Sequence, residues 1–78
     1  MPRYFFHVHD GRSALDSDGT ELPDRESACV EAIRLAGSLL RDDAAHLALG
    51  EAWRLEVADE RGTGLYRVDI QASAIDGP

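Results

Sequence analysis

The chain has 78 residues, enough for one domain, with a formal net charge of −7 and one cysteine. One cysteine excludes an intramolecular disulfide and a zinc knuckle built from several cysteines, and it suits a reducing compartment. The basic residues are scattered rather than clustered, which disfavours nucleic acid as a partner. No window holds the roughly 20 apolar residues that cross a bilayer. We therefore expect one cytoplasmic domain over residues 1–78, without a membrane partner.

The first predicted element is a strand over residues 3–9, because aromatic and β-branched side chains alternate there with a period of two. Asp10-Gly11 predicts a tight turn, since glycine tolerates a positive φ. A short second strand follows over about residues 13–16, with a possible extension to residue 22 that Asp18-Gly19 interrupts. Together these segments predict a first β-hairpin.

A long helix is expected between Asp24 and the Asp42-Asp43 pair. Asp24 is a good N-cap because its carboxylate can accept a backbone N–H, and Arg41 near the end complements the helix dipole. Apolar side chains recur at spacings of three and four and form one stripe suited to covering a sheet. The stripe consists of Ala28, Cys29, Ala32, Ile33, Ala36, Leu39 and Leu40. Residues 44–49 are expected to continue as a ragged helical turn that Gly50 ends.

Two further strands form a second predicted hairpin. Apolar and mainly charged side chains alternate over residues 53–58, and again over residues 66–70. Asp59-Glu60-Arg61-Gly62 between them is typical of a hairpin loop, with Gly62 at a positive-φ position. Residues 71–78 are mostly small and polar, so we expect a loose C-terminal tail.

These elements predict an α+β fold of ββαββ type, a mainly antiparallel four-stranded sheet with one helix packed on one face. Strand parity then divides the sheet into a core face and an opposite face that stays open. The core face is expected to carry Tyr4, Phe6, Val8, Trp53, Leu55, Val57, Tyr66, Val68 and Ile70. The open face is expected to carry Arg3, Phe5, His7, His9, Arg54, Glu56, Arg67 and Asp69.

Three segments carry a resemblance to a known family. They are the opening Pro2-Arg3-Tyr4-Phe5-Phe6-His7-Val8-His9-Asp10-Gly11, the stretch Asp16-x-x-Gly19-x-Glu21-Leu22-Pro23-Asp24 and the stretch Trp53-Arg54-x-Glu56-Val57-x-Asp59-Glu60-x-Gly62. With these the chain resembles a family of short bacterial proteins classed only as a domain of unknown function. The resemblance covers nearly the whole chain and implies a stand-alone bacterial domain. It brings no activity, cofactor or catalytic residue.

His7 and His9 form the chemically most suggestive pair. Two residues apart on a strand, their imidazoles point to the same side. Asp10 and Asp16 could add oxygen ligands, which would give a site for zinc or a similar metal. Two histidines supply at most half of a four-ligand site, however, so a pair that simply faces solvent is the favoured interpretation. We accordingly expect no cofactor.

The favoured function is a small non-enzymatic binding or regulatory module that acts through protein–protein contacts, as a homodimer. A chain this short has little room for both a core and a ligand cleft of about 300–1,000 Å³. The expected interaction face comprises Phe5, His7, His9, Arg54 and Arg67. Two alternatives stay open. One is a metal-binding protein or metal-dependent enzyme centred on His7 and His9, and the other is nucleic-acid binding through the arginines of the open face.

Overall fold

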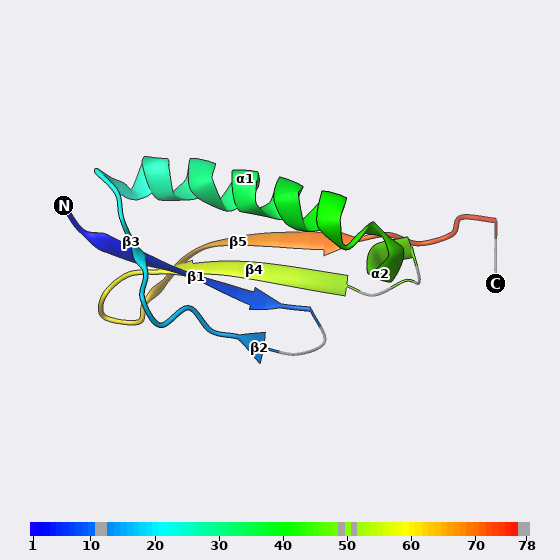
Figure 1. Cartoon of the computed structure of the whole chain (residues 1–78), viewed down its shortest axis with the longest axis horizontal. Helices are drawn as coiled ribbons and strands as arrows, with labels where there is room; N and C mark the ends of the chain where they lie inside the picture. Colours follow the sequence, from blue (N-terminus) through cyan, green and yellow to red (C-terminus); the bar gives the residue numbers. More distant parts are fainter. Residues whose placement is uncertain (11–12, 49, 51, 77–78) are drawn as a thin grey trace.

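The computed structural model describes residues 1–10, 13–48, 50 and 52–76. One long helix lies along one face of a twisted sheet, and a short second helix follows it (Figure 1). The elements are β1 (Arg3–His9), β2 (Ser13–Ala14), β3 (Thr20–Glu21), α1 (Arg25–Asp42), α2 (Ala44–Ala48), β4 (Ala52–Ala58) and β5 (Gly64–Gln71). The predicted α+β fold, an antiparallel sheet with one long helix packed on it, is confirmed.

The sheet has the strand order β2-β1-β4-β5, and every pairing is antiparallel. β3 also pairs with β1, further along the edge that β2 occupies. The strand expected over residues 13–16 is shorter than predicted and ends at Ala14. Its expected continuation beyond an interruption at Asp18-Gly19 is present as β3, which also lies beside β1. Gly11 of the expected turn lies outside the described residues.

α1 begins and ends where its capping residues predict. The Oδ1 atom of Asp24 accepts the backbone N–H of Ser27 at 2.8 Å. The hydrogen bonds that Asp24 accepts from Ser27 hold the pKa of this carboxyl below its usual value. At the other end the N–H of Asp43 donates to the carbonyl of Leu39 at 2.9 Å, and Arg41 lies in the last turn. The expected helical turn after Asp43 is confirmed as α2.

The core lies between α1 and the inner face of the sheet. A single cluster is formed by the buried residues Tyr4, Ala28, Ala32, Ala36, Leu55 and Val57. Leu55 and Val57, in the central strand β4, are the largest fully buried side chains. The three alanines, spaced four apart, make one small-residue row of α1, and this row lets the helix backbone lie close to β4.

Two helix residues expected in the core lie at the surface instead. Ile33 is 53% exposed and Leu40 is 42% exposed. The alanine row takes the position directly above the sheet, so side chains further around the helix are turned towards one flank. The apolar stripe of α1 is therefore wider than the surface that the sheet covers.

Tyr66 lies opposite the buried Val57, on the core face of the sheet as predicted, but it is 37% exposed rather than buried. Val57 pairs with Tyr66, whereas Ala58 pairs with Gly64, so the β4–β5 ladder contains a β-bulge that leaves Leu65 as the extra residue. Leu65 packs against the core cluster in place of Tyr66.

The second hairpin has the predicted loop. Gly62 adopts a φ of +83°, and the Oδ1 atom of Asp59 accepts the N–H groups of Arg61 and Thr63 at 2.9 Å each. β5 ends at Gln71, and residues 72–76 are irregular and exposed. Within the described ranges no helix is long and apolar enough to cross a membrane.

Candidate functional site

The outer face of the sheet is the face opposite α1, and it carries the predicted interaction residues. Cross-strand pairing builds two rows on this face. One row runs through His7, Glu56 and Arg67, and the other runs through His9, Arg54 and Asp69. Each row combines basic or imidazole groups with a carboxylate, so the face is polar and close to balanced in charge.

Glu56 is the centre of the polar contacts on the outer face. Its Oε1 atom lies 3.0 Å from Nε2 of His9, and its Oε2 atom lies 3.4 Å from Nε of Arg54. On β5 the Nε of Arg67 donates to Oδ2 of Asp69 at 3.0 Å. The Arg54–Glu56 and Arg67–Asp69 ion pairs are exposed, so each adds at most about 1 kcal/mol of stability, whereas the side chain of His9 is largely buried. They do show that both arginines of the predicted interaction face lie beside carboxylates rather than forming a positive surface.

Asp16 fills the gap between β2 and β3 along the edge of β1. Its Oδ2 atom accepts the N–H of Phe6 at 3.2 Å, and its Oδ1 atom accepts the N–H groups of Asp18 and Gly19 at 3.1 and 3.0 Å. The bond from Gly19 contributes most to lowering the pKa of this carboxyl, and partial burial opposes the shift. The carboxylate thus acts as a structural acceptor in place of a strand partner.

His7 is tied to the same loop. The N–H of Asp16 donates to Nδ1 of His7 at 3.0 Å. The contact therefore fixes the ring of His7 against the loop.

Phe5, which strand parity places on the open face, is only partly accessible. Its ring stacks on His7 with centroids 6.5 Å apart and an interplanar angle of 13°. Gly19, with a φ of +72°, comes so close that an added Cβ would lie 2.8 Å from Cε2 of Phe5 and 2.7 Å from Cγ of Arg3. The loop that carries Gly19 therefore partly covers the outer side of Phe5.

The structure does not gather the candidate metal ligands. Nδ1 of His7 accepts a backbone N–H, and Nε2 of His9 lies against Glu56. Across the described ranges, no three side chains of His, Cys, Asp or Glu come together as a group that could hold a metal ion.

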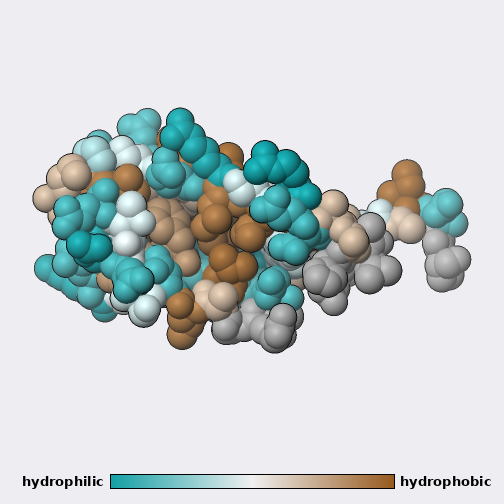
Figure 2. Space-filling view, in the orientation of Figure 1, coloured by the Kyte–Doolittle hydropathy of each residue, from teal (hydrophilic) through white to brown (hydrophobic). Residues whose placement is uncertain are grey.

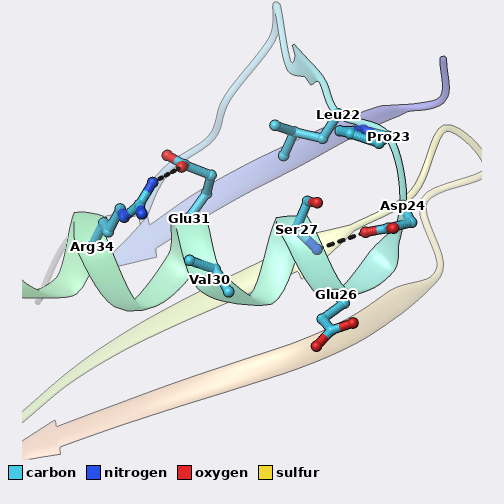
Figure 3. Close-up of a pocket in the computed structure, with 8 residues that line it drawn as sticks. All are labelled: Leu22, Pro23, Asp24, Glu26, Ser27, Val30, Glu31 and Arg34. Atoms are coloured by element: carbon cyan, nitrogen blue, oxygen red, sulfur yellow. Dashed lines mark hydrogen bonds and ion pairs between the residues drawn. The ribbon is translucent and has the colours of Figure 1, made fainter.

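Two shallow grooves lie along the side of α1 that faces β1 and β3. One, of about 420 Å³, surrounds its first turns between Leu22 and Arg34 (Figure 3). The other, of about 290 Å³, opens between Phe6 and Leu35, where hydrophobic residues gather in a band between α1 and β1 (Figure 2). The first is lined at its end by the N-cap residue Asp24 and by the ion pair Glu31–Arg34, so its polar groups already serve the helix.

The opposite flank of α1 carries the exposed apolar side chains. In Figure 3, Ser27 and Glu31 point towards the side of Leu22, whereas Glu26 points to the side where β5 lies. Ile33 and Leu40 follow Glu26 at intervals of seven residues, and this spacing keeps side chains on one flank with a drift of only about 20° per heptad. Ile33 and Leu40 therefore lie on the β5 side of the helix.

We call Ile33, Leu40 and the strand segment 66–70 the β5-edge surface. In the described part of the chain no strand pairs with the outer edge of β5. Sequence patterns did not predict this surface, because helical spacing and strand parity placed Ile33, Leu40 and Tyr66 in the core. One sequence feature could have indicated this surface. The apolar arc of α1 contains a row of alanines and, beside it, a second row of larger side chains, so the arc is wider than one sheet face needs.

Comparison with known proteins identifies a family but no function. The family model described as Domain of unknown function (DUF6894) matches residues 3–71. No curated protein and no solved structure matches the chain.

Proposed function

The chain belongs to this family of domains of unknown function, and we propose that it is a non-enzymatic module that acts through protein–protein contacts, as a homodimer. The β5-edge surface carries the proposal. Large apolar side chains there are exposed on α1 next to a strand whose outer edge has no partner among the described residues. Covering both features is favourable. Complete burial of a fully exposed Ile or Leu side chain contributes about 1.5–3 kcal/mol, and Ile33 and Leu40, about half exposed, can supply about half of that each. An unpaired strand edge also offers free N–H and C=O groups.

The outer face of the sheet is the second proposed contact surface, available to a protein other than a second copy. Of its predicted residues, Arg54 and Arg67 are exposed, whereas Phe5, His7 and His9 are only partly accessible. A polar face in which exposed arginines lie beside carboxylates resembles the rim of a protein interface more than its apolar centre. We therefore assign self-association to the β5-edge surface and partner binding to the outer face.

We further propose the bacterial cytoplasm as the compartment. Cys29 is a free, half-buried cysteine, which is compatible with a reducing environment. Fractionation of bacterial cells that express the chain tests this assignment, and recovery in the periplasmic or membrane fraction would refute it.

Light scattering over a wide range of protein concentration tests the proposed function. The unchanged chain should approach twice its 8.5 kDa mass as concentration rises. Ile33→Gln should shift this transition to higher concentration, because it removes an exposed apolar side chain while keeping a good helix former. Arg34→Gln, a change at the adjacent exposed position on another side of α1, should leave the transition in place.

Two results would count against this proposal. A mass that stays at 8.5 kDa at every concentration would refute the homodimer. A transition that Ile33→Gln leaves unchanged would remove α1 from the contact surface.

A further inference from the structure

The outer edge of β5 has a self-complementary sequence. A twofold axis that pairs two copies of one strand antiparallel stands perpendicular to the sheet and passes between the two copies of one residue, which we call an axis at that residue. Such an axis keeps the core faces of the two copies on the same side. Arg67 and Asp69 lie on the outer face of β5 and are exposed. An axis at Arg67 would oppose two arginines, and an axis at Asp69 would oppose two aspartates. Only an axis at Val68 places each arginine opposite an aspartate of the second copy.

The same register suits the core side of the strand. An axis at Val68 places Val68 opposite itself and Tyr66 opposite Ile70. These are apolar and aromatic cross-strand pairs, which stabilise antiparallel sheets. The β-bulge at Leu65 lies outside this segment, so residues 66–70 form a regular ladder that is centred on Val68. The opposite charges, the apolar cross-strand pairs and the regular ladder therefore all favour the register in which Val68 lies opposite its own copy.

The exposed flank of α1 lies on the side of the molecule that this axis would approach. α1 contacts both β4 and β5, so two copies of the helix would lie over the continuous sheet on the same face, one on each side of the axis. Ile33 and Leu40 would then face the helix of the second copy. Gly37 is exposed in the same part of α1, and apart from the neighbouring helix backbone no described atom lies within 4 Å of where its Cβ would be. A glycine there leaves room for helices to approach at about 8–10 Å.

We propose that a second copy of this chain binds at the β5-edge surface, by antiparallel β5–β5 pairing centred on Val68, to form one continuous sheet with both α1 helices on the same face. This inference rests on the homodimer of the proposed function, for which it names the contact and the register. A strand ladder alone is smaller than the roughly 800 Å² per partner of a standard interface, and the helix flanks supply the additional apolar area.

Cysteine crosslinking tests the register. Arg67→Cys and Asp69→Cys are each made in a Cys29→Ala background, so that every crosslink comes from β5. Directly opposite residues of an antiparallel pair have Cα atoms about 4.5–5.5 Å apart, within the range that a disulfide spans. In an equal mixture of the two variants under mild oxidation, the mixed disulfide should form about tenfold more readily than either homodisulfide.

The alternative crosslinks overturn the inference. Preferential linking of Arg67→Cys to itself would place the axis at residue 67, and preferential linking of Asp69→Cys to itself would place it at residue 69. A dimer by light scattering that gives no preferred crosslink would refute the β5 contact while leaving the homodimer intact. A chain that stays monomeric would refute both.

Charge reversal gives an independent readout without cysteine. Arg67→Asp places like charges opposite each other twice per dimer and should raise the dimer dissociation constant about tenfold. Asp69→Arg should act in the same direction, and the double swap Arg67→Asp/Asp69→Arg should restore most of the lost affinity. Unfolding at low concentration should be little changed by either single variant, because both side chains are exposed. Additive weakening in the double swap would contradict the proposed pairing.

Discussion

Replacement of Asp16 by asparagine should destabilise the fold by about 2 kcal/mol. The carboxylate accepts three backbone N–H groups, from Phe6 on one oxygen and from Asp18 and Gly19 on the other. Asparagine keeps one acceptor oxygen, which fits best facing the two loop donors, and its NH₂ group then lies against the N–H of Phe6. A partly buried donor left without an acceptor costs about 1–3 kcal/mol, and the two remaining hydrogen bonds become weaker because their acceptor is no longer charged.

Urea unfolding followed by the fluorescence of Trp53 measures this effect, because Trp53 is the chain's one tryptophan and is only 3% exposed. Asp18→Asn is the matched control, since only the backbone of Asp18 is hydrogen bonded within the described ranges. The lowered pKa of Asp16 means that its contribution is complete above about pH 4 and is lost as pH falls through the folded-state pKa. The gap between the unchanged chain and Asp16→Asn should therefore narrow on acidification. Equal stability of both asparagine variants at neutral pH would refute the role given to Asp16.

Two further substitutions test the loop and the core. Gly19→Ala should lower the free energy of unfolding by about 1–3 kcal/mol, because the added Cβ would collide with Arg3 and Phe5. Gly62→Ala, also at a positive φ but with no described atom near the added Cβ, should lower it by only about 1 kcal/mol. Equal melting temperatures of the two variants would contradict the close approach at Gly19. Leu55→Ala should lower the free energy of unfolding by about 2–5 kcal/mol in the same urea assay, and a loss below about 1 kcal/mol would show that β4 is not the centre of the core.

Local patterns predicted the elements whose determinants lie close together in the sequence. The N-cap at Asp24 and the loop that ends at Gly62 depend on contacts within a few residues, and both have the expected geometry. The alternation along β4 also placed Leu55 and Val57 correctly, because this strand lies in the centre of the sheet under α1.

The remaining features depend on contacts between distant segments. The second strand is divided because the carboxylate of Asp16, rather than a backbone carbonyl, accepts the N–H of Phe6. Helical periodicity gives the width of an apolar arc but not which part of it meets a sheet, so Ile33 and Leu40 could not be assigned to the surface from spacing alone. The bulge that exposes Tyr66 likewise depends on how β4 and β5 pair.

Strand parity predicted the positions of some residues of the outer face but not their local contacts. The parity of the strands correctly placed Arg54 and Arg67 together on the outer face, because alternate residues of neighbouring strands share a side. Parity gave no indication that a loop would return over Phe5 or that Asp16 would bind His7. These contacts arise from a segment more than eight residues away in the sequence.

Amide hydrogen exchange of β5 at low and high protein concentration tests the proposed dimer most directly. In the single chain, alternate N–H groups of residues 66–70 point away from β4 and should exchange readily. We expect these N–H groups to become protected as concentration rises, while exchange in the loop at residues 59–63 stays constant. Equal exchange of residues 66–70 at both concentrations, in a sample that light scattering shows to be dimeric, would contradict pairing through this edge.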